Sequence, residues 1–422
     1  MGNTTSRSKV DDADRIVLQR LAKRKAEIAA DPTNLERKRL WYALDGGNAE
    51  RPMVLAEILG VLNETLPDSV LECKDPGLRG LEYRLRMELY QFDILGDDHV
   101  IEPAIDMPWR AKIGDYGVSA TMEFGDNDGR LGAHVWDHPI KDLDRDLEKL
   151  HFRTLEVDRE GTAERKALWE DIFDGILPVR IRGSYWWSMG MTLTAIQLIG
   201  LENLMLYMYD NPEGLKRLMS FLRDDHLHLA RRLEEEGLMT LNNENDYLGS
   251  GSIGYTHDLP RKQQDNGGAR LKDLWVLLES QETVGVGPKQ FEEFVFPYQA
   301  SLAELFGKCY YGCCEPVNNR WHILKNMPGL SRVSVSPWAD EEFMADTLGN
   351  DIVYSRKPNP TQISTGSFDE KAIRAGIART LSIAKDCRVE LIMKDVHTLN
   401  NQPERLARWV EIAREVIDEM YG

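Results

Sequence analysis

Three of the chain's five cysteines lie in one short segment, KCYYGCCEPVNNRW, at residues 308–321. Cys313 and Cys314 lack C-x-x-C spacing, and the peptide between adjacent cysteines strains a disulfide, which disfavours a redox pair. Alternation along a strand predicts Tyr311 and Cys313 on one face and Cys314 on the other, in helix packing. Zinc prefers sulfur and imidazole ligands, so Cys313 is a candidate zinc thiolate. The alternative is that Cys313 is a small buried apolar residue.

His397 is the histidine best placed for chemistry, because it follows the last apolar run, RVELIMKD. There it could act as a metal ligand or as an acid–base group beside Lys394 and Asp395. A purely structural role, the commoner fate of a lone histidine, is the alternative.

Polar and ionisable residues gather where the chain's apolar runs end. In chain order they are Glu57; Arg182, Tyr185 and Trp186; Glu279, Gln281 and Glu282; Tyr311, Cys313 and Glu315; Ser336 and Trp338; Arg356, Lys357 and Asn359; and Lys394, Asp395 and His397. Solubility alone would not place charge at one end of so many buried strands, so this pattern predicts a pocket. Structural alternatives are a buried ion pair for Glu57 or Arg182, a solvated Lys394–Asp395 pair, and rim packing for Trp338.

The apolar runs that must position these residues alternate with helical patterns. The runs lie at 51–60, 98–106, 177–183, 238–245, 273–280, 308–314, 330–336, 351–356 and 388–395. Alternating strands and helices imply a parallel sheet. About eight such strands predict a closed (β/α)₈ TIM barrel, whose site lies at the carboxyl ends of the strands. A polar leader with helices at 1–48 precedes a barrel domain at 49–422, and the Gly- and Asp-rich stretch 107–160 predicts an inserted hairpin region. YLGSGSIGYTHDLP, residues 247–260, is a long Gly- and Ser-rich loop of the kind that often carries function.

Composition narrows the class of protein. The 422 residues are 42% hydrophobic, which suits a globular chain with a large core, and carry a formal charge of −18. That charge disfavours nucleic acid and anionic membranes as partners. No apolar run approaches the roughly 18–20 residues of a membrane helix. An odd number of cysteines argues against a disulfide framework and favours a reducing cytoplasm.

Longer motifs resemble the uroporphyrinogen decarboxylase superfamily. The resemblance rests on VLLESQETVGVGPKQFEEFVFPY, PVRIRGSYWWSMGMTLTAIQLIG and DIVYSRKPNP, and it extends over about residues 50–420. GCCEP, SPW, RKPNP and MKDVHT are similar to a decarboxylase-like branch grouped with zinc- and corrinoid-dependent methyltransferases. No arginine cluster follows the first strand, as a substrate with many carboxylates would need, so uroporphyrinogen decarboxylation is not expected.

The resemblance implies a methyltransferase that moves a methyl group between a small methylated substrate, such as a methoxy compound or methylamine, and a corrinoid (cobalamin). The family often shows H-x-C and a later cysteine; here Tyr311-x-Cys313 and His397 stand at those places. Cys313 and His397, completed by Glu315 or Glu282, would hold Zn²⁺ as a Lewis acid. The expected catalytic residues are Glu279, Glu282, Lys394 and Asp395. The expected substrate-binding residues are Glu57, Arg182, Tyr185, Trp186, Gln281, Tyr311, Trp338, Arg356, Lys357 and Asn359.

No corrinoid-binding D-x-H-x-x-G motif occurs in the sequence, so the corrinoid would come on a partner protein or free. A second copy of the chain, in a homodimer, is a further expected partner. One alternative function is a metal-free decarboxylase or lyase, in which cationic side chains hold a carboxylated substrate and Glu279 or Asp395 is the general acid. The other is a non-catalytic barrel that binds a corrinoid or tetrapyrrole.

Overall fold

The computed structural model of the chain describes residues 10–125, 134–260 and 268–422, so the first nine residues of the predicted leader lie outside it. Within these ranges, one parallel sheet has the strand order β1-β14-β13-β12-β11-β10. Its strands are β1 Met53–Ala56, β10 Trp275–Leu278, β11 Lys308–Tyr311, β12 Leu330–Val335, β13 Val353–Arg356 and β14 Val389–Met393. A separate parallel pair consists of β2 Ile105–Pro108 and β7 Val179–Arg182. The prediction of an α/β fold with a parallel sheet is confirmed.

The strands of the main sheet are buried because both of their faces are covered. β1, β10, β11, β13 and β14 are buried along their whole length, as parallel strands between two layers should be. β1 pairs with β14 from Met53↔Glu390 to Ala56↔Met393, and β10 pairs with β11 from Trp275↔Lys308 to Leu278↔Tyr311. Parallel pairing brings all carboxyl ends of this sheet to one edge.

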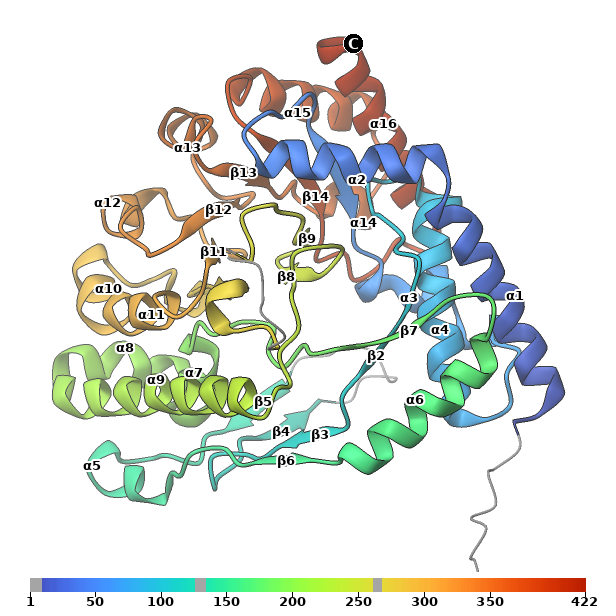
Figure 1. Cartoon of the computed structure of the whole chain (residues 1–422). Helices are drawn as coiled ribbons and strands as arrows, with labels where there is room; N and C mark the ends of the chain where they lie inside the picture. The colour runs from blue at the N-terminus through green and yellow to red at the C-terminus, as the bar shows by residue number, and fades with distance from the viewer. Residues whose placement is uncertain (1–9, 126–133, 261–267) are drawn as a thin grey trace, which may run out of the picture.

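Helices connect the strands and cover the outside of the sheet (Figure 1). They are α7 Thr192–Ile199, α8 Leu201–Asp210 and α9 Pro212–Glu235 after β7; α10 Pro288–Phe294 and α11 Phe296–Ala303 after β10; α12 Trp321–Leu324 after β11; α13 Glu341–Leu348 after β12; α14 Thr361–Ser364 and α15 Glu370–Ile383 after β13; and α16 Glu404–Tyr421 after β14. The amphipathic helix α16 buries Leu406, Trp409 and Val416 in the main hydrophobic core.

The N-terminal helices pack on the same body. α1 Asp12–Ala29 and α2 Pro32–Asp45 precede β1; α3 Leu62–Thr65, α4 Pro76–Tyr90, α5 Leu143–Asp146 and α6 Arg159–Phe173 come later. Leu18 and Leu21 of α1 share an apolar cluster with Leu81 of α4, Phe173 of α6 and Met107 of β2. The first helix therefore buries its apolar face against the elements around β2 and β7.

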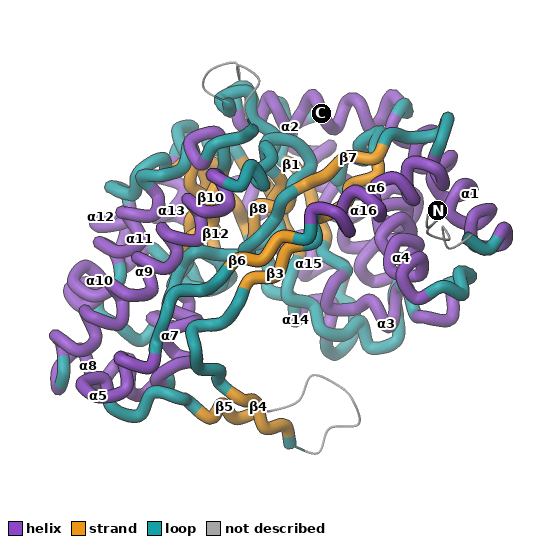
Figure 2. The backbone as a smooth tube through the Cα atoms, turned by 60° about the horizontal axis from the view of Figure 1, so that its bottom comes forward, coloured by secondary structure: helices purple, strands orange, loops and turns teal. Residues whose placement is uncertain are grey.

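The stretch 107–160 forms the expected hairpin region. β3 Ala111–Ile113 pairs antiparallel with β6 Leu155–Val157, and β4 Thr121–Phe124 pairs antiparallel with β5 His134–Asp137. Figure 2 shows β4 and β5 standing apart from the helices and strands of the main body.

A second hairpin lies inside the ring of strands and helices in Figure 1. β8 Tyr247–Gly249 pairs with β9 Ser252–Ile253. The Ser252 hydroxyl donates to Glu390 of β14 at 3.0 Å, and Arg332 of β12 donates to the Ile253 carbonyl at 3.0 Å. The expectation of a strand at 238–245 is wrong: these residues form irregular backbone ahead of the hairpin, and the Asn242 side chain, in place of a strand ladder, bonds the backbone of Trp275.

Among the described strands, the six-stranded parallel sheet and the parallel pair β2–β7 are not joined by a ladder of strand-to-strand hydrogen bonds. Next to β1, the Asp98 N–H donates to the Val54 carbonyl at 2.7 Å, so the segment before β2 joins the two sheets on that side. Between β7 and β10, the Gly183 N–H donates to Thr240 and the Asn242 side chain bonds the backbone of Trp275. Closure into a barrel stays a prediction. Among the described helices, none combines the length and apolarity that crossing a membrane requires.

Candidate functional site

The candidate site lies at the carboxyl edge of the parallel sheet, where the sequence predicts it. Glu57 follows β1, Glu279 follows β10, Cys313 follows β11 and Lys394 follows β14. Glu279, Cys313 and Lys394 are buried, so their charges and hydrogen bonds act in a poorly solvated environment.

Of the described cysteines at this edge, Cys313 lies closest to a cationic side chain. The Lys394 ammonium lies 3.4 Å from the Cys313 sulfur, and the Cys314 sulfur lies 3.6 Å from it. The hydrogen bond with the Cys314 thiol and the Lys394 charge lower the pKa of Cys313, against the effect of burial. The Cys313 thiol therefore ionises more readily than an ordinary cysteine.

Cys314 lies on the same side as Cys313, so the expectation that it packs behind the strand is wrong. β11 ends at Tyr311, and Gly312 has a φ of +96°, a turn that a residue with a Cβ disfavours. Strand alternation therefore stops before the two cysteines. The Cys314 thiol is partly exposed and donates to the Asp395 carboxylate at 3.2 Å.

Glu279 is a buried carboxyl group that ionises less readily than an ordinary one. Burial and the negative charges of Glu282 and Glu315 raise its pKa well above the usual range. The hydroxyl of the partly exposed Ser188 lies 3.0 Å from Glu279 Oε1. A Cβ at Gly190 would come within 2.2 Å of the Glu279 carbonyl oxygen, so only glycine lets this loop cover Glu279. The carboxyl group can exchange a proton with the outside through the Ser188 hydroxyl.

Two other predicted acids are tied to neighbouring segments. Glu282 accepts a hydrogen bond from the Thr192 hydroxyl at 2.6 Å. Glu57 accepts one from the Tyr247 hydroxyl of the inner hairpin at 2.8 Å. The structure thus connects the end of β1 to the hairpin and the end of β10 to α7.

Lys357 follows β13 and is buried. Its ammonium donates to the Tyr310 hydroxyl at 2.8 Å and to the Ser355 carbonyl at 3.2 Å. Burial lowers the pKa of Lys357 to about 7, although the Glu390 carboxylate opposes this effect. Lys357 can therefore be a neutral amine near neutral pH.

Some predicted substrate-binding residues have other partners. Arg356 bonds Glu341 of α13 at 3.0 Å, and Asn359 bonds the backbone N–H of Thr361 at 3.0 Å. The buried Tyr311 points to the helix layer, where it donates to Gln299 at 3.0 Å. Arg182 forms an ion pair with Asp246. Tyr311 points outward because its neighbour Tyr310 takes the inward position of the strand.

The predicted zinc ligands do not converge in this structure. Both oxygens of the buried Glu315 carboxylate accept backbone N–H groups, from Ser280 and Cys313, each at 2.9 Å. His397 is exposed and lies beside Gly60. Its Nδ1 atom is 3.5 Å from the position that a Cβ atom on Gly60 would occupy. Across residues 10–125, 134–260 and 268–422, no three His, Cys, Asp or Glu side chains are arranged to hold a metal. These three residues do not fit a zinc site in this arrangement.

Two cavities open beside these groups. The first, of about 400 Å³, is lined by Gln281, Glu282, Val284, Cys314, Pro316 and Trp338. The second, of about 520 Å³, lies between β7 and β10, and its wall includes Tyr185, Trp186, Trp187, Asp246 and Tyr247. The predicted residues Gln281, Glu282 and Trp338 thus share one cavity, whereas Tyr185 and Trp186 line the other.

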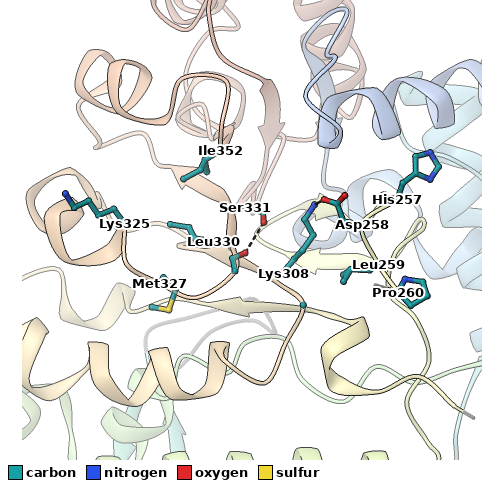
Figure 3. Close-up of a pocket in the computed structure, with 12 residues that line it drawn as sticks. His257, Asp258, Leu259, Pro260, Lys308, Lys325, Met327, Leu330, Ser331 and Ile352 are labelled. Carbon is teal, nitrogen blue, oxygen red and sulfur yellow. Dashed lines mark hydrogen bonds and ion pairs between the residues drawn. The ribbon is translucent and has the colours of Figure 1, made fainter. Parts of the chain in front are cut away.

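A larger cavity, of about 730 Å³, opens at the amino ends of β11 and β12 (Figure 3). Figure 3 shows Lys308 directed at Asp258. The Lys308 ammonium lies 2.7 Å from Asp45 and 2.5 Å from Asp258, so its charge is already neutralised. The carboxyl edge, where the pKa of Glu279 is raised and the pKa of Cys313 is lowered, is the better candidate for catalysis.

Four residues at the carboxyl edge were not predicted: Ser188, Tyr247, Tyr310 and Cys314. Ser188 and Tyr247 lie at or beside irregular backbone, where no sequence periodicity predicts which way a side chain points. The Gly- and Ser-rich run that begins at Tyr247 was the available signal for the hairpin. Strand alternation predicts Tyr311 on the inner face of the strand, whereas the structure places its neighbour Tyr310 there.

Comparison with known proteins supports the fold. No protein-family model matches the chain, and no curated protein matches its sequence. The chain is structurally similar to a methyltransferase from Methanosarcina mazei, with a TM-score of 0.51 and 13% sequence identity. The similarity covers 92% of this chain and 99% of that chain. At this identity, the likeness concerns the fold.

Proposed function

We propose that the chain is a methyltransferase that moves a methyl group from a small methoxy compound to a corrinoid, which is free or carried by a partner protein. We also infer that the parallel strands close into a (β/α)₈ barrel of the uroporphyrinogen decarboxylase type. The fold shared with a methyltransferase is compatible with this proposal. The observation that carries it is the buried Glu279, hydrogen-bonded to the partly exposed Ser188 hydroxyl at 3.0 Å and with its pKa raised by burial.

Demethylation of a methoxy compound requires a proton. When the methyl group leaves, its oxygen becomes an alkoxide or phenoxide, and a positioned acid that protonates it lowers the barrier. Glu279 would supply that proton through Ser188. A carboxyl group with a raised pKa suits this role because it keeps its proton to a higher pH than an ordinary carboxyl group does.

The other side chains would bind and orient the substrate. Trp338 and Val284 offer apolar surface beside Cys314 in the first cavity, and Tyr185 and Trp186 offer aromatic surface in the second. Lys394 would bind an anionic group of the substrate. Zinc has no step in this proposal, because the three predicted ligands do not converge.

The test compares methyl donors that differ in their need for a proton. Purified protein is mixed with cob(I)alamin and a methyl donor, and methylcobalamin is followed by its absorbance. A methoxy donor needs protonation of its leaving oxygen, whereas a quaternary methylammonium donor releases a neutral amine. We expect Glu279→Gln to lower kcat for the methoxy donor by about 100-fold or more and to leave the ammonium reaction nearly unchanged.

Glu304→Gln, at an exposed site on the helix layer, is the matched control and should behave as the native chain. An equal loss with both donors would show that Glu279 is structural. If no donor methylates cobalamin, methyl transfer to this acceptor is wrong.

A metal-free lyase is the second candidate, and one observation favours it. Lys394 follows β14 at the same carboxyl edge as Glu279, which follows β10, and its ammonium could hold a carboxylate there. Release of carbon dioxide from a carboxylated substrate, without formation of methylcobalamin, would support this candidate.

A further inference from the structure

The two adjacent thiols at the carboxyl edge have no role in the proposed methyl transfer. Cys313 and Cys314 are both free, and their sulfur atoms lie 3.6 Å apart. A direct disulfide between them would close a small ring through one strained peptide. An atom that forms two longer bonds to sulfur could bridge the pair at nearly its present separation.

The surroundings of the pair are suited to such a bridge. The Lys394 ammonium lies 3.4 Å from the Cys313 sulfur and favours its ionisation, and the Asp395 carboxylate, 3.2 Å from the Cys314 sulfur, can accept the Cys314 proton. Cys314 also lines the first cavity, where Val284, Pro316 and Trp338 provide an apolar wall. Cys314 thus opens onto a space that can hold an organic group, and the Cys313 sulfur lies 3.6 Å from it.

We propose that Cys313 and Cys314 form a dithiol site for monosubstituted trivalent arsenicals, R–As(OH)₂, whose R group occupies the first cavity. The partly exposed Cys314 reacts first: its sulfur bonds to arsenic, and its proton leaves with one hydroxide as water. Cys313 then forms the second As–S bond, and the second hydroxide takes a proton from solvent. No atom changes oxidation state, so no oxidant or reductant is needed.

The selectivity for a doubly bonding ligand follows from the geometry. A reagent that bonds one sulfur gains nothing from the neighbour, whereas an arsenical held by Cys314 meets Cys313 at a high effective concentration. Of the other described cysteines, Cys73 and Cys309 are buried and Cys387 donates to the Ala345 carbonyl at 3.4 Å. Cys313 and Cys314 are the pair for which the structure gives a sulfur–sulfur contact.

The experiment titrates the full reduced chain with phenylarsine oxide. Intact mass spectrometry counts the adducts, and a chromogenic disulfide reagent counts the remaining thiols. We expect one arsenical per chain, the loss of two reactive thiols, and reversal by a dithiol but not by an equal amount of a monothiol. Cys314→Ser should weaken binding by about 100-fold or more, and Cys313→Ser by a similar factor.

Cys387→Ser is the matched control and should bind as the native chain does. If Cys313→Ser fails to fold, Cys314→Ser decides, because its side chain is partly exposed. Unchanged binding in Cys314→Ser would overturn the proposal, as would an adduct mapped to Cys73 or Cys309.

Discussion

The Lys394 ammonium and the Cys313 sulfur lie 3.4 Å apart, although two strands separate β14 from β11 in the sheet order. Three strand spacings in a flat sheet would place the strand ends about 14 Å apart, more than these two side chains can span. The sheet must therefore curl until the ends of β11 and β14 face each other. This curvature brings the Cys313 sulfur to the Lys394 ammonium and is the sense of bending that a barrel requires.

Replacing Lys394 should raise the pKa of Cys313. Lys394→Met removes the cation but keeps a flexible apolar chain of similar length, so the thiolate loses a stabilising charge. The midpoint of the thiolate absorbance titration is expected to move up by about one pH unit or more. Lys385→Met, at an exposed site, should leave the titration unchanged. An unmoved midpoint in Lys394→Met would show that Cys314 alone sets the acidity of Cys313.

Lys357 should make the stability of the fold rise with pH. Burial lowers its pKa to about 7 in the folded chain, from the ordinary 10.5. Between these values the unfolded chain binds more protons than the folded chain, so the free energy of unfolding rises with pH there and stays level below about 7. Relative to Lys357→Met, the native chain should gain up to about 1.4 kcal/mol per pH unit.

Urea unfolding of both proteins, from about pH 6 to about pH 9, measures this difference. Lys385→Met should run parallel to the native chain. A constant difference between the native chain and Lys357→Met would mean that Lys357 stays charged and is held by the Tyr310 and Ser355 bonds.

The sequence predicts the strands of the carboxyl edge better than it predicts the direction of their side chains. Apolar runs identify β1, β7 and β10–β14 because each is a short buried segment between helices. Periodicity cannot show where a strand stops, and Gly312 ends the alternation just before Cys313 and Cys314. The sequence also does not show which group a side chain contacts, because the partner is set by the tertiary fold. Arg356 bonds Glu341, and Glu315 accepts two backbone N–H groups. The inner hairpin at Tyr247 was suspected as a functional loop, but only the fold places it against Glu57.

Glu315 should stabilise the fold instead of binding metal. Glu315→Gln replaces one of two buried acceptors with an amide donor that faces a backbone N–H group, so the free energy of unfolding should fall by about 1–3 kcal/mol. Denaturant unfolding with and without added zinc measures the effect, and the exposed Glu304→Gln is the control. A metal ligand would behave differently: the variant would lose bound zinc and would match the native chain once zinc is removed.

Trp338 should contribute to substrate binding but not to stability. Its side chain lines the first cavity and is 68% exposed, so it contributes little to the core. We expect Trp338→Ala to change the free energy of unfolding by no more than about 0.5 kcal/mol and to raise KM for the methyl donor with little change in kcat, because wall contacts bind substrate and transition state alike. Tyr209→Ala, on α8 and 70% exposed, is the control and should leave KM unchanged. If Trp338→Ala leaves KM unchanged, the substrate does not use this cavity, and the aromatic wall at Tyr185 and Trp186 becomes the place to examine.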